Sequence, residues 1–175
     1  TTIRALDFAP FTPDAPAPDV QFHFVPAMLE DHGREKVKGH GFSVHACVLR
    51  PESRGTVRLA GPDIATAPVI DPAFLSDDRD MAVLRAGVRM MHRIVASPPL
   101  SDYQAQDRHP VALDDDAALD AEIRGRADTV YHPVGTCRMG SDAGAVVDPM
   151  LKARGVDGLW VADASVMPRL VSGNT

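Results

Sequence analysis

The chain has 175 residues, of which 45% are hydrophobic and 24% charged, an ordinary composition for a globular domain that buries a core. Its formal net charge of −6 and its scattered positive residues argue against a nucleic-acid binder. The sequence contains no apolar run near the roughly 20 residues of a membrane span and no secretory apolar segment at its start. We expect a cytoplasmic protein, or a membrane-associated one as part of a longer chain.

The chain opens with an extended connector and a strand. Residues 1–19 contain four prolines, all from residue 10 onward, and proline removes backbone donors and fixes φ. Residues 20–25 alternate in polarity, with Phe22 and Phe24 on one face and His23 on the other. This alternation predicts a strand with one buried face.

A hairpin is predicted next. Residues 30–40 are charged, contain two glycines and predict a surface loop. Residues 41–49 alternate again, 50–55 have the composition of a turn, and 56–59 return with alternation. The pattern predicts that 41–49 and 56–59 pair as a hairpin with a long loop.

Two helices follow. Residues 76–79 supply a cap and first-turn acids for a helix to about residue 96, and a second helix over 116–124 is capped by Asp114 or Asp115. The buried stripe of the first helix is expected to be Met81, Leu84, Val88, Met91 and Val95. Three arginines at four-residue steps are expected to form a solvated ridge: Arg85, Arg89 and Arg93.

The last strand signal differs from the earlier ones. Residues 159–162 form a short continuous apolar run, which favours a strand covered on both faces, as in a parallel sheet. The fold class is therefore predicted as α+β. An antiparallel sheet flanked by helices is followed by a returning strand segment that belongs to another sheet.

Three polar residues near the carboxyl terminus are candidates for chemistry, and each has a plain structural alternative. His132 has a side chain suited to general-base work, although a single histidine before a proline is more often structural. Asp163 ends the apolar run, where ligands of open α/β sheets bind, but it also fits a turn. Asn174 taken alone reads as a turn residue.

Taken together, these residues belong to a longer ordered pattern. Residues 131–140 read YHPVGTCRMG, 145–149 read AVVDP, and 158–175 read GLWVADASVMPRLVSGNT. The pattern resembles the carboxyl-terminal signature of the glucose–methanol–choline (GMC) family of FAD-dependent alcohol oxidoreductases, and within it the choline dehydrogenase-like branch. The resemblance extends back to about residue 19.

The resemblance implies specific roles in alcohol oxidation. His132 matches the family's active-site histidine near flavin N5, where a neutral imidazole takes the hydroxyl proton as hydride moves to the flavin. Asn174 matches its partner, whose amide donates to the developing oxyanion. His23 matches a position near the substrate cavity. The expected substrate is a small alcohol, and choline rests on the resemblance alone because the 5% aromatic content offers no evident aromatic cage.

The resemblance also implies a cofactor and a domain organisation. Asp163 and Ala164 match positions that contact FAD, and Thr175 lies where family backbone groups approach the flavin ring. The sequence contains no GxGxxG turn, so the main FAD site is expected in a missing amino-terminal part. Residues 1–128 are expected to form the substrate-binding domain. Residues 129–175 are expected to form an active-site segment that completes the FAD domain and is truncated at its end.

Two other classes of function remain open. The chain alone also fits a catalytically silent cap or interaction domain. A hydrolase is a weaker alternative, because histidines 40 and 45 would point to opposite faces of a strand and no GxSxG surrounds Ser165 or Ser172. Cys47 and Cys137 lack ligand spacing, so we predict free thiols and no metal site.

Overall fold

The computed structural model describes residues 4–7, 11–12, 15–30, 35–172 and 175. The chain divides into two compact units, which are considered separately. The first contains Thr1–Leu49 and Asp78–Ala127, and the second contains Arg50–Asp77 and Asp128–Thr175. Residues 50–77 thus cluster with the carboxyl-terminal segment, while the predicted functional division at residue 128 stays a prediction.

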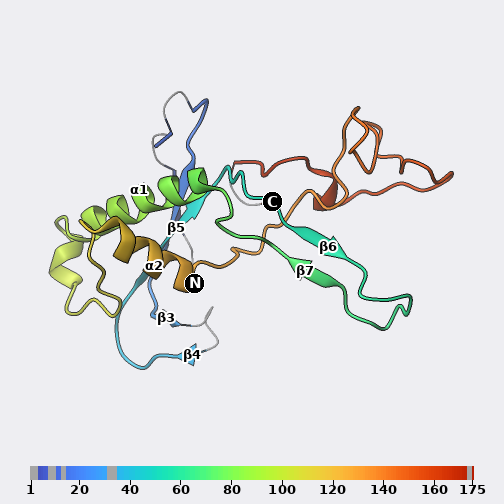
Figure 1. The fold of residues 1–175 in the computed structure, drawn as a ribbon. Helices are drawn as coiled ribbons and strands as arrows, with labels where there is room; N and C mark the ends of the chain where they lie inside the picture. The colour runs from blue at the N-terminus through green and yellow to red at the C-terminus, as the bar shows by residue number, and fades with distance from the viewer. Residues whose placement is uncertain (1–3, 8–10, 13–14, 31–34, 173–174) are drawn as a thin grey trace. The chain divides into compact units, whose positions relative to one another are not determined.

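The first unit is built on a three-stranded antiparallel sheet in the order β1-β2-β5 (Figure 1). Its strands are β1 (Arg4–Asp7), β2 (Val20–Val25) and β5 (Ser43–Val48). The predicted strand over residues 20–25 is confirmed. In register, His23 of β2 lies opposite His45 of β5. These elements and the helices confirm the α+β class.

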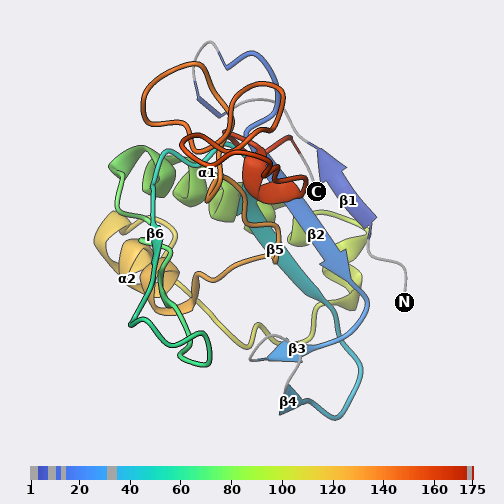
Figure 2. The same cartoon turned by 90° about the vertical axis from the view of Figure 1, so that its right-hand side faces the viewer.

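Helix α1 (Asp78–Val95) covers one face of this sheet, as Figures 1 and 2 show. The helix approaches closely at Gly87, where an added Cβ would lie 3.1 Å from Val20 Cγ1 and 3.5 Å from Ala46 Cβ. Because side chains alternate along a strand, the face under α1 is the one that carries Val20, Phe22 and Phe24. Val20, Phe22 and Met81 are almost fully buried there.

Helix α2 (Asp116–Arg126) packs beside α1 and begins at the predicted cap, where Asp115 accepts hydrogen bonds from the N–H groups of Ala117 and Ala118. The expected solvated arginine ridge is wrong for two of its three members. Arg85 donates a hydrogen bond to Asp116 at 2.6 Å and forms an ion pair with Asp120 at 2.8 Å. Arg89 donates hydrogen bonds to Asp116 and to the Leu113 carbonyl. Helical periodicity placed the arginines on one face, but it carried no information about the acidic residues of α2 opposite them.

The region predicted as a surface loop contains paired strands. β3 (Leu29–Glu30) and β4 (Glu35–Lys36) form a short antiparallel ladder. The Glu30 carboxylate accepts a hydrogen bond from Arg108 Nε at 2.9 Å and lies 3.1 Å from His109 Nε2. These side-chain hydrogen bonds lower the pKa of Glu30 and tie β3 to the chain that follows the short helix η2 (Leu100–Tyr103).

The second unit contains a hairpin that differs from the predicted one. β6 (Thr56–Arg58) pairs with β7 (Val69–Asp71), whereas β5 pairs with β2. The predicted pairing of residues 41–49 with 56–59 is therefore wrong. Alternation identifies which face of a strand is apolar, but it does not identify the partner strand.

The carboxyl-terminal part of the second unit is mostly turns around a small core. Ala145, Val147 and Val166 are buried, and Val166 ends the short helix η3 (Ala164–Val166). Residues 159–162 form a single antiparallel bridge, between Lys152 and Trp160, instead of the predicted strand covered on both faces. Leu159 is 47% exposed and Trp160 58% exposed, because the described residues supply no strand on either side of them. Among the described residues, no helix has the length and apolar character needed to cross a bilayer.

Candidate active site

His132 and Thr175 meet within the second unit although 43 residues separate them. His132 Nδ1 lies 3.1 Å from Thr175 Oγ1, and the Thr175 backbone N–H donates to the same nitrogen at 3.3 Å. Both contacts converge on one ring nitrogen, and which ring nitrogen carries the proton decides whether Nδ1 donates to the hydroxyl or accepts from the N–H. Asn174, the predicted partner of His132, lies outside the described residues and stays a prediction.

The backbone around His132 is constrained on both sides. Tyr131 has a φ of 66°, in the left-handed region that non-glycine residues rarely adopt, and its N–H donates to Thr129 Oγ1 at 2.9 Å. Pro133 follows and favours extended backbone at His132. The left-handed conformation of Tyr131 costs on the order of 1–3 kcal/mol, and strained backbone of this kind is found disproportionately at functional sites.

The turn after His132 is fastened to the segment that carries Asp163 and Ala164. The Ser165 carbonyl accepts hydrogen bonds from the N–H of Gly135 at 3.1 Å and from that of Cys137 at 3.0 Å. The Met139 N–H donates to the Val166 carbonyl at 2.8 Å. Gly135 has a φ of +92°, a conformation that strains any residue with a Cβ. The histidine turn and the predicted cofactor segment thus form one hydrogen-bonded assembly.

Asp163 caps the helix η3. Its carboxylate accepts a hydrogen bond from the Ser165 N–H at 2.8 Å. The Ser165 hydroxyl, followed by this N–H, lowers the pKa of Asp163, which therefore stays ionised at neutral pH. An exposed, ionised carboxylate beside a half-buried Ala164 suits a hydrogen bond from a hydroxyl of a polyol such as the ribityl chain of FAD. The chemistry of these residues therefore fits the predicted cofactor contact.

Two polar contacts in this unit were not predicted. Arg138 forms a forked pair with Asp142 at 2.9 and 2.6 Å, which holds the pKa of Asp142 well below its usual range and closes the turn before Ala145. Arg50 donates to Ser172 Oγ at 2.5 Å and fixes the chain shortly before Thr175. Arginine and acid four residues apart at 138 and 142 could have suggested the first contact, while no sequence signal joins residues 50 and 172.

His23 lies in the first unit, at the centre of β2, on the sheet face opposite the one covered by α1. Its predicted place near the substrate stays a prediction. Cys47 and Cys137 are both free thiols. In the part of the chain that the structure describes, no group of three or more His, Cys, Asp or Glu side chains is placed to hold a metal ion.

Comparison with known proteins gives consistent relatives. An alcohol dehydrogenase (acceptor) from Pseudomonas putida is 43% identical over 169 residues, which cover 96% of this chain and 31% of that protein. The mitochondrial choline dehydrogenase of Homo sapiens is 39% identical over 165 residues, which cover 93% of this chain and 28% of that protein. The crystal structure of pyridoxine 4-oxidase from Mesorbium loti superposes with a TM-score of 0.87 at 30% identity, covering 97% of this chain and 34% of that one.

These matches place the chain at about a third of the length of the relatives it resembles. A family model described as GMC oxidoreductase matches residues 51–175, which include the His132 turn and the Asp163 segment. Because the family model covers most of the chain and the relatives match nearly all of it, the chain belongs to the GMC oxidoreductase family.

Proposed function

We propose that this chain is the substrate-side and active-site part of an FAD-dependent alcohol oxidoreductase in which His132 removes the proton of the substrate hydroxyl. FAD, when bound, accepts the hydride from the carbon that carries this hydroxyl. The observation that supports the proposal most directly is the contact of Thr175 with His132 Nδ1. It leaves the other ring nitrogen, Nε2, as the atom for the alcohol. Choline is one candidate alcohol, since a choline dehydrogenase is among the relatives.

Thr175 can hold the imidazole in two ways. When Nδ1 carries the proton, it donates to Thr175 Oγ1, and the Nε2 lone pair is available as a base. When Nδ1 accepts the Thr175 N–H, the proton of the neutral ring lies on Nε2, which then donates to the substrate oxygen. When Nε2 takes the substrate proton, the ring carries protons on both nitrogens, and Nδ1 continues to donate to Thr175 Oγ1, which holds the imidazolium in place.

The other predicted residues complete the proposed site. Asn174, next to Thr175, would donate its amide N–H to the substrate oxygen as negative charge develops, a contribution of roughly 3 kcal/mol when its geometry is fixed in advance. Asp163 and Ala164 would contact the FAD chain, and the Thr175 backbone would approach the flavin ring. His23 would line the substrate side. Residues 1–128 would form the substrate-binding domain and 129–175 the active-site segment.

The remaining FAD site would come from an amino-terminal part of a longer polypeptide. Three exposed apolar side chains support such a partner surface: Leu159, Trp160 and Met150. Large exposed apolar side chains that lie together are usually covered by a partner. The 175-residue chain alone is then expected to bind FAD weakly or not at all. Stoichiometric flavin absorbance in the purified chain would contradict this part of the proposal. A cytoplasmic location stays a prediction.

The test is the replacement His132→Ala in the full-length protein, with anaerobic stopped-flow measurement of flavin reduction by an alcohol substrate. Loss of the base is expected to slow reduction by roughly 10²–10⁴-fold. The matched control is His92→Ala, which changes a histidine near the end of α1 and is expected to leave the rate unchanged. A rate unaffected by His132→Ala would refute the proposal and favour a catalytically silent cap domain.

A further inference from the structure

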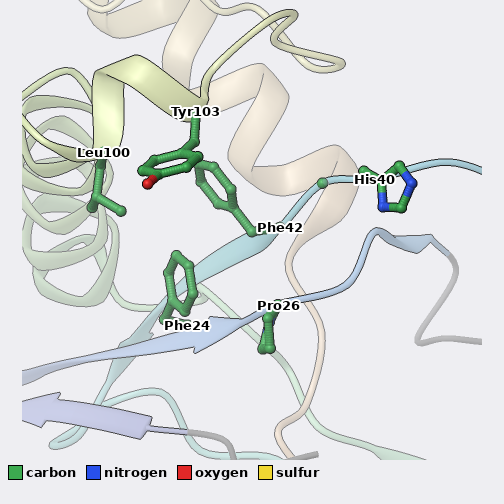
Figure 3. A pocket seen from close by; sticks show the side chains of 7 residues that line it. Phe24, Pro26, His40, Phe42, Leu100 and Tyr103 are labelled. Atoms are coloured by element: carbon green, nitrogen blue, oxygen red, sulfur yellow. The ribbon is translucent and has the colours of Figure 1, made fainter.

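Three aromatic side chains gather in the first unit although the sequence offers no evident aromatic cluster. The Phe24 and Phe42 rings stack with their centroids 5.2 Å apart and an interplanar angle of 28°. Figure 3 shows the Tyr103 ring beside Phe42, with Leu100 at one end. Together they border a hollow of about 300 Å³, here termed the aromatic hollow, lined by Phe24, Pro26, His40, Gly41, Phe42, Leu100 and Tyr103.

The aromatic hollow lies on a different face of the sheet from His23. Phe24 follows His23 in β2, and successive side chains of a strand point to opposite faces. Phe24 therefore lies on the face of the sheet that α1 covers, while His23 lies on the other face. A ligand in the aromatic hollow would therefore lie on the opposite face of the sheet from His23.

Two walls of the hollow are held in place by Ser43. Its hydroxyl donates to the Ala27 carbonyl at 2.9 Å and accepts the Leu29 N–H at 2.9 Å, which joins the chain after Pro26 to the start of β5. Gly41 fits this junction because it has no side chain. An added Cβ would lie 2.7 Å from Met28 Cγ and 2.9 Å from Met28 Sδ.

The third wall is the helix η2, which carries Leu100 and Tyr103. Its start is fixed by the Ser101 N–H, which donates to the Ser97 carbonyl at 3.2 Å. Farther along the chain, Arg108 and His109 hold the Glu30 carboxylate of β3. Ser43 thus ties the Pro26 and Phe42 walls to each other, and the Glu30 contacts tie the chain after η2 to β3, which limits the rearrangement that a ligand would require.

The lining determines the chemical class of the ligand. None of the seven lining residues carries a carboxylate, a guanidinium or an ammonium group, so a cationic ligand would find no carboxylate in the wall and an anionic one only the His40 imidazole. The stacked rings favour a planar aromatic group, because aromatic pairs gain roughly 0.5–1.5 kcal/mol beyond the burial of their area. Tyr103 is 77% exposed and can contact a ligand without first leaving the core.

We propose that the aromatic hollow is a binding site for an uncharged aromatic small molecule. The probe is benzamide, which is uncharged and is not an alcohol. Three compounds test its features: benzoate adds a negative charge, benzyltrimethylammonium a positive one, and cyclohexanecarboxamide replaces the flat ring. Binding to the full-length protein is measured by ligand-observed NMR titration.

Saturable binding of benzamide that is tighter than that of all three comparison compounds is expected. Tyr103→Ala is expected to weaken it roughly three- to tenfold, and Phe42→Leu, which keeps apolar volume but removes a ring, should act in the same direction. The control is Phe74→Ala, which removes an exposed phenyl group of the second unit and should leave the affinity unchanged.

Several results would overturn the proposal. Equal affinity in wild type and Tyr103→Ala would place the probe elsewhere on the protein. The absence of saturable binding would mean that the aromatic hollow does not bind the probe. Tighter binding of benzyltrimethylammonium would indicate a cation site instead, and equal binding of cyclohexanecarboxamide would remove the aromatic requirement. Tyr103→Ala is expected to keep the wild-type unfolding midpoint, since its side chain is mostly exposed, so a loss of binding in it cannot be attributed to unfolding.

Discussion

His132 Nδ1 lies 3.1 Å from Thr175 Oγ1, and the backbone N–H of the same threonine reaches this nitrogen at 3.3 Å. The hydroxyl can accept a hydrogen bond from Nδ1–H, whereas the N–H can only donate to Nδ1. Of these two groups of Thr175, the hydroxyl is therefore the one that favours the tautomer with an unprotonated Nε2.

Thr175→Val removes this hydroxyl and keeps the side-chain shape. We expect the rate of flavin reduction in the full-length protein to fall about three- to tenfold, equivalent to the roughly 0.5–1.5 kcal/mol of one hydrogen bond. The ¹⁵N chemical shifts of the His132 ring should move toward the tautomer protonated on Nε2. Thr175→Ser keeps the hydroxyl and serves as the control. If the valine variant retained both the rate and the shifts, Thr175 would have no part in setting the tautomer.

Gly135→Ala tests the turn that positions His132. A φ of +92° strains alanine, so the hydrogen bonds of Gly135 and Cys137 to the Ser165 carbonyl should weaken and the imidazole should shift. A misplacement near 1 Å can cost about 100-fold in rate, and we expect flavin reduction to slow by roughly 10- to 100-fold. Gly125→Ala is the matched control, because an added Cβ there meets nothing within 4 Å. Equal rates in both variants would contradict the role of this turn.

Asp19 should make the stability of the protein depend on pH. Burial would raise the pKa of its carboxyl, but hydrogen bonds from the Thr12 side chain and from the N–H groups of Phe11 and Thr12 lower it below its usual value. Because the folded-state pKa is lowered, the stabilisation is fully present above the unfolded value near 3.9 and is lost as pH falls through the folded value. We expect Asp19→Asn to lower the free energy of unfolding by about 1–3 kcal/mol at pH 7.

Urea unfolding of the Asp19 variant and the wild type at pH 7 and at pH 3 measures this difference, which should shrink at the lower pH. Asp114→Asn changes an exposed carboxylate and should have little effect at either pH. A difference that stayed constant with pH would show that the carboxylate's ionisation does not contribute.

Gly55 is expected to be essential for the β6–β7 hairpin. An added Cβ at this position would lie 2.1 Å from the Asp71 carbonyl oxygen and 2.6 Å from the Pro72 carbonyl carbon, both of them backbone atoms. Gly55→Ala should therefore lower the free energy of unfolding by about 1–3 kcal/mol or more, as overpacking does. Gly61→Ala lies in the same hairpin, where a Cβ meets nothing, and should change it little. Similar stabilities of the two variants would contradict the close approach.

The two helices and the strand over residues 20–25 could be predicted because their signals are local. Asp115 caps α2 through its own neighbours, and the apolar spacing of α1 appears within a few turns. The partner of β6 could not be predicted, because alternation is satisfied by any adjacent strand. The exposure of residues 159–162 was not predicted. An apolar run indicates that its side chains are buried by some neighbouring segment, but it does not indicate whether the described residues contain that segment.

The candidate site was predictable as a set of residues and not as a geometry. The ordered pattern pointed to His132 and Asp163, whose roles stay predictions, and the structure joins their two segments through hydrogen bonds to the Ser165 carbonyl. The contact of Thr175 with His132 Nδ1 joins residues that are 43 positions apart, and no local sequence pattern predicts such a contact. The aromatic hollow was missed for the same reason, since Phe24, Phe42 and Tyr103 are widely spaced along the chain.

The Ser165 carbonyl accepts two hydrogen bonds from the turn after His132, and the N–H of the same residue donates to the Asp163 carboxylate. A single residue is therefore common to the turn after His132 and to the proposed cofactor contact. Altering the length of either loop would displace the other, so both loops are expected to tolerate insertions at residues 132–137 or 163–167 poorly.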